Sequence, residues 1–431
     1  MTSPRTLLFY LNHFWPEISP TQIAATHTIE AMVKQGWDAH VFAPRRDATW
    51  PTEISFRGAT VHRVPWPMRG PWRMRRYYHQ LGLHLDASLA STGQATSLMV
   101  GFDCSADLGA LRRAADKRGA RFIAVVNREL HPQFASGRPL SRSWIRRLNL
   151  ADEIVTCCPA VHDWLVGQGA LNTPLTLLPT VIFNEVEMIA SLDRDAVRKS
   201  LGRLHPLLDA EPNQPVALAL PSFDGDPGID DLLVAWSSIV RNVPRARLWL
   251  IGDGPDWRRV ARRVADMGLD PSVCLPGVFD CWSDLAQAAN VYLHGSRWPG
   301  DCLGLKSALA AGCPAVATQA WEWRAVPRFP APVAEGSPGF QNSNGRETPG
   351  RWTRTELEET NISEPVVRVP LSDPAAMAKS VISLFQDPPA AEALGTQAAN
   401  WVAEQWPTDQ VAAAWQQVME YATCTLRVAP K

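Results

Sequence analysis

Short apolar runs alternate with amphipathic stretches along the first half of this 431-residue chain. The run RTLLFYLNHF at 5–14 is typical of a buried strand. Apolar residues then recur at helical spacing through 20–35, and Gly36 follows as a helix stop. The order of strand, helix and strand returns in 96–127 and again in 153–179. This repeat predicts a parallel sheet flanked by helices.

The same order restarts in the second half, after a polar and proline-bearing segment at about 185–215. Apolar runs, beginning with PVALALP and ending with CPAVAT, alternate there with amphipathic stretches. Residues 335–362 are rich in glycine, serine, asparagine and threonine, which indicates a long exposed loop. Helical patterns return at 373–386 and at about 389–423.

The pattern therefore predicts an α/β chain of two Rossmann-like, doubly wound domains that face a central cleft. A chain of this length is too long for one core of ordinary size. Domains of this kind bind ligands at the carboxyl ends of their strands. We expect an N-terminal domain, a linker, a C-terminal domain and terminal helices, at 1–190, 191–213, 214–386 and 387–431.

Composition narrows the class of protein. The net charge of −1 argues against a nucleic-acid partner. The eight cysteines are scattered apart from Cys157 and Cys158, so we expect neither a metal site nor a disulfide framework, and a reducing cytosol fits. The first apolar run lacks the features of a signal peptide, and no stretch approaches the roughly 18 apolar residues of a membrane span. We expect a cytoplasmic protein.

The loop after the first apolar run is a candidate for ligand contact. Residues 10–22 contain no glycine, so this loop lacks the G-x-G-x-x-G fingerprint of an NAD site. The loop ends in Ser19, Pro20 and Thr21. These residues fit either a simple helix N-cap or a helix start that faces the cleft and receives an anion.

Two further loops, in the second half, carry glycines between a strand and a helix. Gly252 and Gly254 fit either a plain tight turn or a close approach of a ligand to the backbone. The stretch VYLHGSRWPGDCLGLKSALAAGCPAVAT, at 291–318, contains a strand, a glycine-rich loop and a helix that starts near Asp301 and Cys302. The free N–H groups of such a helix start can hold a diphosphate.

The order of these segments resembles that of the retaining glycosyltransferases with two Rossmann-like domains, the GT-B type, and specifically family 4, also called group 1. The strongest match is GIDDLLVAWSSIVRNVPRARLWLIGDGP, which is similar to the family's run of KG-x-x-x-L-x-x-A and P-x-x-x-L-x-x-x-G-x-G-P. SVCLPGV, DLAQAANVYLHGSRWPG and AAGCPAVAT follow in the family's order, and the resemblance covers nearly the whole chain.

The resemblance implies a function. A nucleotide-sugar donor would bind the second domain, a glycan, lipid-linked or small-molecule acceptor would bind the first, and the sugar would be transferred with retention. The resemblance also implies transfer without a metal ion or other cofactor, a C-terminal helix that crosses back to the first domain, and a place in cell-surface polysaccharide biosynthesis.

The resemblance also implies roles for particular residues. Ser19, Pro20 and Thr21 would form the acceptor or phosphate loop. Asn127 stands where the family often has a histidine near the transferred sugar, and Asp301 either replaces a family carboxylate or caps the helix, so these two are the candidate catalytic residues. Donor contacts would come from Ser222, Gly252, Gly254, Gly277, Val278, Arg297, Gly300, Cys302, Leu303 and Ser307.

Four positions depart from the family pattern. Ser222 and Pro227 stand where the family places an arginine and a lysine on the donor diphosphate, and Pro299 and Ser307 stand at the two glutamates of its E-x7-E signature. Two readings follow: a transferase that holds phosphate mainly through backbone N–H groups, and a catalytically degenerate binding or scaffolding protein. The glycine-free first loop argues against a third reading, an NAD-dependent enzyme.

The segment VPWPMRGPWRMRRYYHQ, at 64–80, mixes four arginines with tryptophan and tyrosine. This composition suits a peripheral contact with the inner face of a membrane, or a lipid-phosphate acceptor. A solvated loop or a stretch with buried aromatic rings fits it as well.

Overall fold

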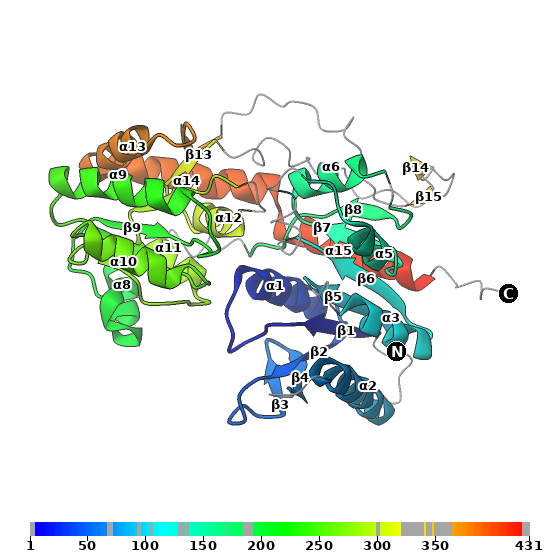
Figure 1. Ribbon diagram of the computed structural model, residues 1–431. Coiled ribbons are helices and arrows are strands. Elements are labelled where there is room, and N and C mark those ends of the chain that lie inside the picture. The colour runs from blue at the N-terminus through cyan, green and yellow to red at the C-terminus, as the bar shows by residue number, and fades with distance from the viewer. Residues whose placement is uncertain are drawn as a thin grey trace.

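The computed structural model describes two α/β bodies that lie side by side (Figure 1). The described residues are 5–66, 72–92, 96–103, 107–127, 134, 138–169, 171–183, 193–298, 302–319, 340–341, 347–348 and 364–424.

The first body is built on one sheet, which has eight strands within the described residues. Its strand order is β3-β4-β2-β1-β5-β6-β7-β8, and every pair is parallel except β3 with β4. The parallel sheet is as the alternation of strands and helices predicts. The strands are β1 (Thr6–Leu11), β2 (Asp38–Arg45), β3 (Glu53–Phe56), β4 (Ala59–Pro65), β5 (Thr96–Phe102), β6 (Arg121–Val125), β7 (Glu153–Thr156) and β8 (Leu175–Leu177).

Helices cover both faces of this sheet (Figure 1). The helix expected over 20–35 is α1 (Pro20–Lys34), which begins where Ser19 accepts a hydrogen bond from the backbone N–H of Gln22. Residues 73–80 belong to a helix rather than to a solvated loop, because Tyr77 packs into the core. The other helices here are α2 (Arg73–Thr92), α3 (Leu108–Lys117), α5 (Arg142–Leu148) and α6 (Pro159–Gly167).

The second body is built on a parallel sheet that has six strands in the part of the chain described, in the order β11-β10-β9-β12-β13-β16. The strands are β9 (Val216–Ala219), β10 (Arg247–Leu250), β11 (Val273–Cys274), β12 (Val291–His294), β13 (Ala315–Thr318) and β16 (Val367–Val369). Its helices are α9 (Gly228–Asn242), α10 (Trp257–Asp266), α11 (Trp282–Ala288), α12 (Leu303–Ala310) and α13 (Pro374–Gln386).

The expected linker and the expected loop at 335–362 both contain secondary structure that the sequence does not predict. The expected linker carries α8 (Arg194–Leu204) and the short helix η1 (Pro206–Leu208), and Arg198 binds α8 to the second body through the carbonyl of Ala288, 2.9 Å from Nε. Most of the expected loop at 335–362 lies outside the described residues, but it includes an antiparallel pair, β14 (Phe340–Gln341) and β15 (Glu347–Thr348).

Residues 389–423 form two helices, α14 (Pro388–Gln405) and α15 (Thr408–Cys424). Helix α14 runs along the second body, whereas α15 lies against the first (Figure 1). The indole N–H of Trp415 donates to the carbonyl of Pro179, at 2.9 Å, and fixes α15 there. The crossing helix that the resemblance implies is therefore present.

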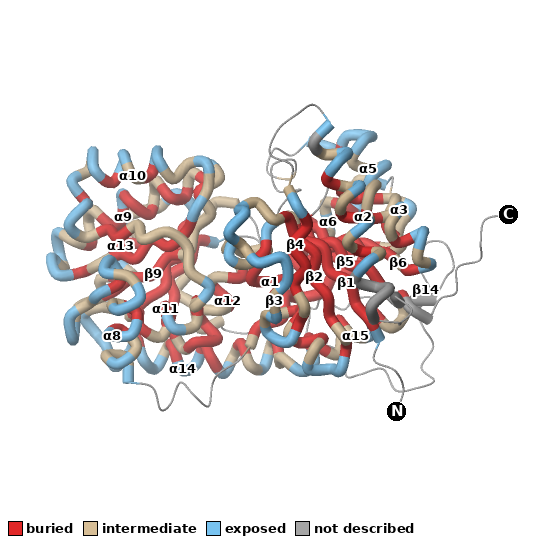
Figure 2. The backbone as a smooth tube through the Cα atoms, turned by 90° about the horizontal axis from the view of Figure 1, so that it is seen from below, coloured by how far each residue is buried: buried red, intermediate tan, exposed pale blue. Residues whose placement is uncertain are grey.

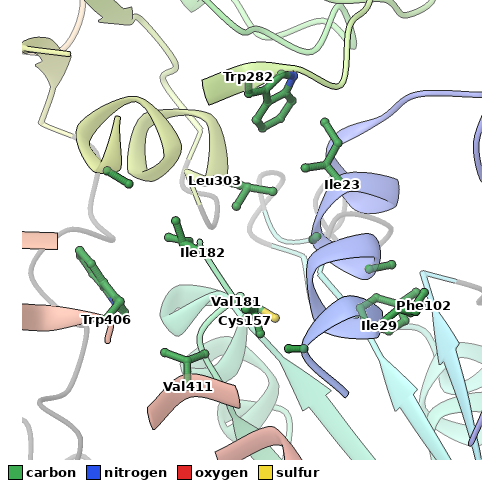
Figure 3. Packing of buried hydrophobic residues seen from close by; sticks show 14 of the residues in the cluster. Ile23, Ile29, Phe102, Cys157, Val181, Ile182, Trp282, Leu303, Trp406 and Val411 are labelled. Carbon is green, nitrogen blue, oxygen red and sulfur yellow. The ribbon is translucent and has the colours of Figure 1, made fainter. Parts of the chain in front are cut away.

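Buried residues occupy the centre of each body (Figure 2). One hydrophobic cluster includes residues of both bodies and of α15. Near its middle, Trp282 of α11, Leu303 of α12 and Ile23 of α1 lie close together across the interface (Figure 3). This packing brings the start of α1 opposite the start of α12.

Candidate active site

Two cavities lie in the cleft between the bodies. The smaller cavity, of about 210 Å³, is bordered by Thr21 and Asn127 of the first body and by Cys302 of the second. The larger cavity, of about 530 Å³, reaches toward Gly252 and Val278. Pro20, Thr21, Ser222 and Trp282 border both cavities. Each cavity therefore has walls from both bodies, at the carboxyl ends of the strands.

The start of α1 is a capped helix end that also borders the cleft. The hydroxyl oxygen of Ser19 accepts from the backbone N–H of Gln22 at 3.1 Å, so Ser19 is an N-cap. Pro20 takes the first helical position. Thr21 borders the cleft, and its hydroxyl donates to Asp103 Oδ2 at 2.8 Å.

Asn127 lies just beyond the end of β6 at Val125, and its contacts fix the orientation of its amide. The side-chain oxygen accepts from the hydroxyl of Thr156 at 3.1 Å and from the backbone N–H of Cys157 at 2.6 Å. The oxygen of the amide is therefore turned to the end of β7, which leaves the NH₂ group for a ligand in the smaller cavity. An amide in this position can donate hydrogen bonds but cannot act as a general base.

Asp103 is a residue of the cleft that sequence reasoning missed. It follows β5 directly, borders the larger cavity, and has a left-handed backbone with φ of 40°. One carboxylate oxygen accepts from Thr21, and the other accepts from the backbone N–H of Asn127 at 2.8 Å. The carboxylate thus joins the ends of α1, β5 and β6. Its place directly after an apolar strand is the signal that could have identified it.

The two aspartates of the loop at 221–228, Asp224 and Asp226, have different surroundings. Asp226 is buried, and its carboxylate accepts from the backbone N–H groups of Gly228, at 2.8 Å, and Arg297, at 3.2 Å, and from the hydroxyl of Ser296. Asp226 therefore ties this loop to the loop after β12. Asp224 borders the smaller cavity.

Close packing between loops requires glycine at residues 252 and 254. A Cβ on Gly252 would lie 2.2 Å from the carbonyl oxygen of Pro221, and one on Gly254 would lie 2.3 Å from that of Phe223. The backbone N–H of Gly252 donates to the carbonyl of Gly277, at 2.9 Å. Only residues without a side chain allow these three loops to meet beside the larger cavity.

Arg297 does not border either cavity. Its guanidinium makes two hydrogen bonds, each of 2.7 Å, to the two carboxylate oxygens of Asp231 on α9. Lys306 is likewise turned away from the cleft, since its ammonium lies 5.4 Å from the ring centre of Trp406 in a buried setting. Within the described residues, no lysine or arginine borders either cavity.

The start of α12 forms one wall of the smaller cavity through Cys302 and Leu303. Gly300 and Asp301, both expected at this site, lie outside the described residues. Ser307 lies further along α12, and its hydroxyl is buried without a hydrogen-bond partner and away from both cavities. Among these features, the first-turn N–H groups of α12 are the ones whose chemistry suits an anion.

Neither a metal centre nor a membrane-spanning helix is found in the described part of the chain. No three histidine, cysteine, aspartate or glutamate residues of that part are grouped to hold a metal ion. No helix there is both long enough and apolar enough to cross a bilayer.

Comparisons with known protein families assign both bodies. A family model described as glycosyl transferases group 1 matches residues 214–328, and one described as glycosyl transferase 4-like domain matches residues 21–180. Among curated proteins, the chain is similar to poly(glycerol-phosphate) alpha-glucosyltransferase of Bacillus subtilis (strain 168), with 32% identity over 82 residues. That match covers 19% of this chain and only 12% of the relative's length.

Solved structures share the fold over nearly the whole chain. Sucrose-phosphate synthase of Thermosynechococcus elongatus has a TM-score of 0.69 at 15% identity, with 97% of this chain and 98% of that chain covered. HepE of Anabaena, solved with UDP and glucose, has a TM-score of 0.67 at 13% identity, with 97% and 99% covered. Given two family models in the expected order on two Rossmann-like bodies, the chain is a divergent member of the group 1, or family 4, glycosyltransferases with the GT-B fold.

Proposed function

We propose that the chain is a retaining glycosyltransferase that moves a sugar from a nucleotide-sugar donor to a glycan, lipid-linked or small-molecule acceptor, without a metal ion or cofactor. The observation that carries this proposal is the pair of adjoining cavities between the bodies: both border the start of α1, and the smaller one also borders the start of α12. The similar HepE structures were solved in complex with UDP and glucose and with UDP-glucose. Both matching family models are transferase models, so a scaffolding role is not favoured.

The donor would lie along the second body. Its diphosphate would accept hydrogen bonds from the first-turn N–H groups at Leu303 and from the hydroxyl of Ser222. The nucleoside would occupy the larger cavity beside Gly252 and Val278. These hydrogen bonds would stabilise the negative charge that develops on the leaving diphosphate.

The transferred sugar and the acceptor would meet the first body. The NH₂ group of Asn127 would donate to a sugar hydroxyl, and the acceptor would enter past Ser19, Pro20 and Thr21. Asp103 would hold the Thr21 hydroxyl and the Asn127 backbone in fixed positions through its two carboxylate oxygens. The acceptor hydroxyl would attack from the face that the leaving diphosphate occupies, which retains the anomeric configuration.

Donor binding would be weak, because no described cation borders the cavities. With a Kd of ~1 mM, a nucleotide at ~10 mM stabilises the folded chain by about 1.4 kcal/mol. We expect a Tm rise of a few degrees with at least one of UDP, GDP, ADP or their glucose conjugates, and none with sodium chloride at the same ionic strength. Unchanged unfolding with all six ligands would contradict the proposal.

We further propose that the protein works at the cytoplasmic face of a membrane and glycosylates a cell-surface polysaccharide or its lipid-linked precursor. Helix α2 supports this through an exposed stripe at helical spacing, made of Trp72, Arg75, Arg76, His79 and Leu83. The Trp72 side chain is 62% exposed, and the Arg75 guanidinium lies 6.0 Å from its ring centre. Aromatic rings and cations on one helix face suit anionic headgroups.

Vesicle binding tests the contact of this stripe with a membrane. We expect the chain to cosediment with vesicles that contain anionic lipid, less so at high salt, and less so when Arg75 and Arg76 become alanine. Replacing two exposed arginines of α10, Arg258 and Arg262, is the matched control and should leave binding unchanged. Equal binding by the two double variants would argue against α2 as the contact.

A further inference from the structure

Apolar side chains form much of the wall of the smaller cavity. On the first body, Ala24 of α1 and Val161 of α6 border this cavity together with Asn127. On the second body, Ile229 and Leu232 of α9 border the same space. All four of these hydrophobic residues belong to the buried core. A ligand that reaches the NH₂ group of Asn127 therefore meets hydrocarbon from both bodies.

Several polar side chains of this cavity are already hydrogen-bonded within the protein. The hydroxyl of Thr21 donates to Asp103 at 2.8 Å, and the hydroxyl of Ser296 donates to the buried carboxylate of Asp226. That carboxylate also accepts from two backbone N–H groups. The amide oxygen of Asn127 accepts from two groups at the end of β7. These groups stabilise the walls of the cavity, and a sugar would have to compete for them.

Among the described residues that border the cavity, few side chains can serve the hydroxyls of a sugar. Asn127 keeps its NH₂ group as a donor, and the carboxylate of Asp224 can accept from a hydroxyl. The hydroxyl of Ser222 would bind the diphosphate, and His294 contacts Cys302, with Nε2 3.5 Å from Sγ. A glucosyl group carries four hydroxyls, each of which both donates and accepts hydrogen bonds. Such a sugar would therefore bury hydroxyl groups against apolar side chains.

We propose that the transferred sugar is a deoxysugar, in which hydrogen replaces at least one of these hydroxyls. This inference rests on the proposed function and names the class of sugar that the donor carries. A hydroxyl buried without a partner loses its hydrogen bonds to water, whereas a methyl or methylene group at the same place gains free energy by leaving water. The apolar side chains of Val161 and Ile229 thus favour the sugar with fewer hydroxyls.

Binding of matched donors to the full chain tests this inference. The probes share whichever of UDP, GDP and ADP raises the Tm most, and they carry either glucose or its 2-, 3-, 4- or 6-deoxy analogue. The Kd of each probe comes from thermal unfolding at increasing ligand concentration. We expect at least one deoxy donor to bind about 5- to 100-fold more tightly than the glucose donor, because no hydroxyl is then left without a partner.

The outcomes separate this inference from the proposed function. If a nucleotide stabilises the chain but the glucose donor binds as tightly as all four deoxy donors, the inference is wrong and the proposed function stands. If none of the three nucleotides stabilises the chain, the proposed function fails and the inference fails with it.

A hydroxyl added to the apolar wall should weaken the preference for the deoxy donor. Val161→Thr and Ile229→Thr each place a hydroxyl there, one from each body. We expect at least one of them to lower the ratio of the two Kd values by about fivefold, while the Kd of the free nucleotide stays unchanged and shows that the variant is folded. Val166→Thr is the matched control, because Val166 lies on the same helix as Val161 but is 60% exposed and borders neither cavity. A ratio that neither Val161→Thr nor Ile229→Thr changes, or that Val166→Thr changes equally, would overturn the inference.

Discussion

Ser222 illustrates how one side chain sets the charge of the cleft. It borders both cavities at the position where the family carries an arginine. A hydroxyl donates one hydrogen bond, whereas a guanidinium has five N–H donors and a permanent charge. The loop after β12 supplies no cation in place of that arginine, because the Arg297 guanidinium is hydrogen-bonded to Asp231.

Ser222→Arg should therefore strengthen nucleotide binding. A hydrogen bond to a charged group is worth about 1.5–3 kcal/mol, so we expect the Kd of UDP, measured by titration calorimetry, to fall by roughly 10- to 100-fold. Ser222→Gln, which is long but uncharged, is the control and should change the Kd little. If the two variants bind UDP equally, the missing charge is not what limits affinity.

His294 should make stability depend on pH. Its pKa is lowered to about 4 by burial, whereas an unfolded histidine has a pKa of about 6.5. The unfolded chain therefore binds more protons between these values, so the contribution is complete above about pH 6.5 and is lost as the pH falls toward 4. The loss is at most about 3 kcal/mol.

Urea unfolding at several pH values measures this effect. In His294→Phe, the free energy of unfolding should fall less steeply between about pH 6.5 and 4 than in the wild type. His79→Phe, at an exposed position of α2, should keep the wild-type slope. A slope that His294→Phe leaves unchanged would show that this ring is not the titrating group.

At the scale of elements, helices that cross closely need glycine at the crossing. Gly395 of α14 packs on the turn that ends α12, and a Cβ there would lie 2.1 Å from the carbonyl oxygen of Gly312. That oxygen belongs to the backbone and cannot move as a flexible side chain would. The contact sets the distance between α14 and α12, the helix that forms the wall of the smaller cavity.

Gly395→Ala should lower the free energy of unfolding by about 1–3 kcal/mol, because the added methyl group forces the two helices apart. Gly82→Ala is the matched control, since Gly82 lies in α2 with open space around it. That substitution should stabilise the chain by about 0.5–1 kcal/mol. Chemical denaturation of both variants distinguishes overpacking from helix propensity, and equal effects would contradict the explanation.

At the scale of the whole molecule, one continuous cluster of buried side chains joins the two bodies. Helix α15 contributes to it from the C-terminal end of the chain, and Trp415 stacks on Phe102 with ring centres 6.2 Å apart. The hydroxyl of Thr408 donates to the carbonyl of Ile182 at 2.7 Å. These contacts attach α15 to the first body and to the segment that follows β8. They therefore help to fix the position of the second body relative to the first.

Trp415→Phe should lower the free energy of unfolding by about 1–3 kcal/mol, because the carbonyl of Pro179 loses its donor in a buried setting. The matched substitution is Trp72→Phe, at a side chain that is 62% exposed, and it should change stability by less than about 0.5 kcal/mol. Thermal unfolding compares the two. A larger loss from Trp72→Phe would contradict this account of α15.

The elements that sequence alone predicted are those whose residues carry a local signal. Alternating apolar runs gave the parallel strands, Ser19 and Pro20 gave the start of α1, and the order of motifs gave the family. Other elements were not predicted. Strand β3 is short and half exposed, α8 lies in a polar segment, and α2 carries many charged residues on its surface.

The chemistry of the cleft was decided by tertiary structure. Sequence suggested Arg297 as a phosphate ligand, but α9 brings Asp231 to its guanidinium. Sequence gave no role to Asp103, yet its two oxygens join residues that are 82 and 24 positions away. Periodicity and capping depend on neighbours along the chain, so they can be read from the sequence. Hydrogen bonds and ion pairs depend on which distant segments the sheets bring together, and only the folded molecule determines that.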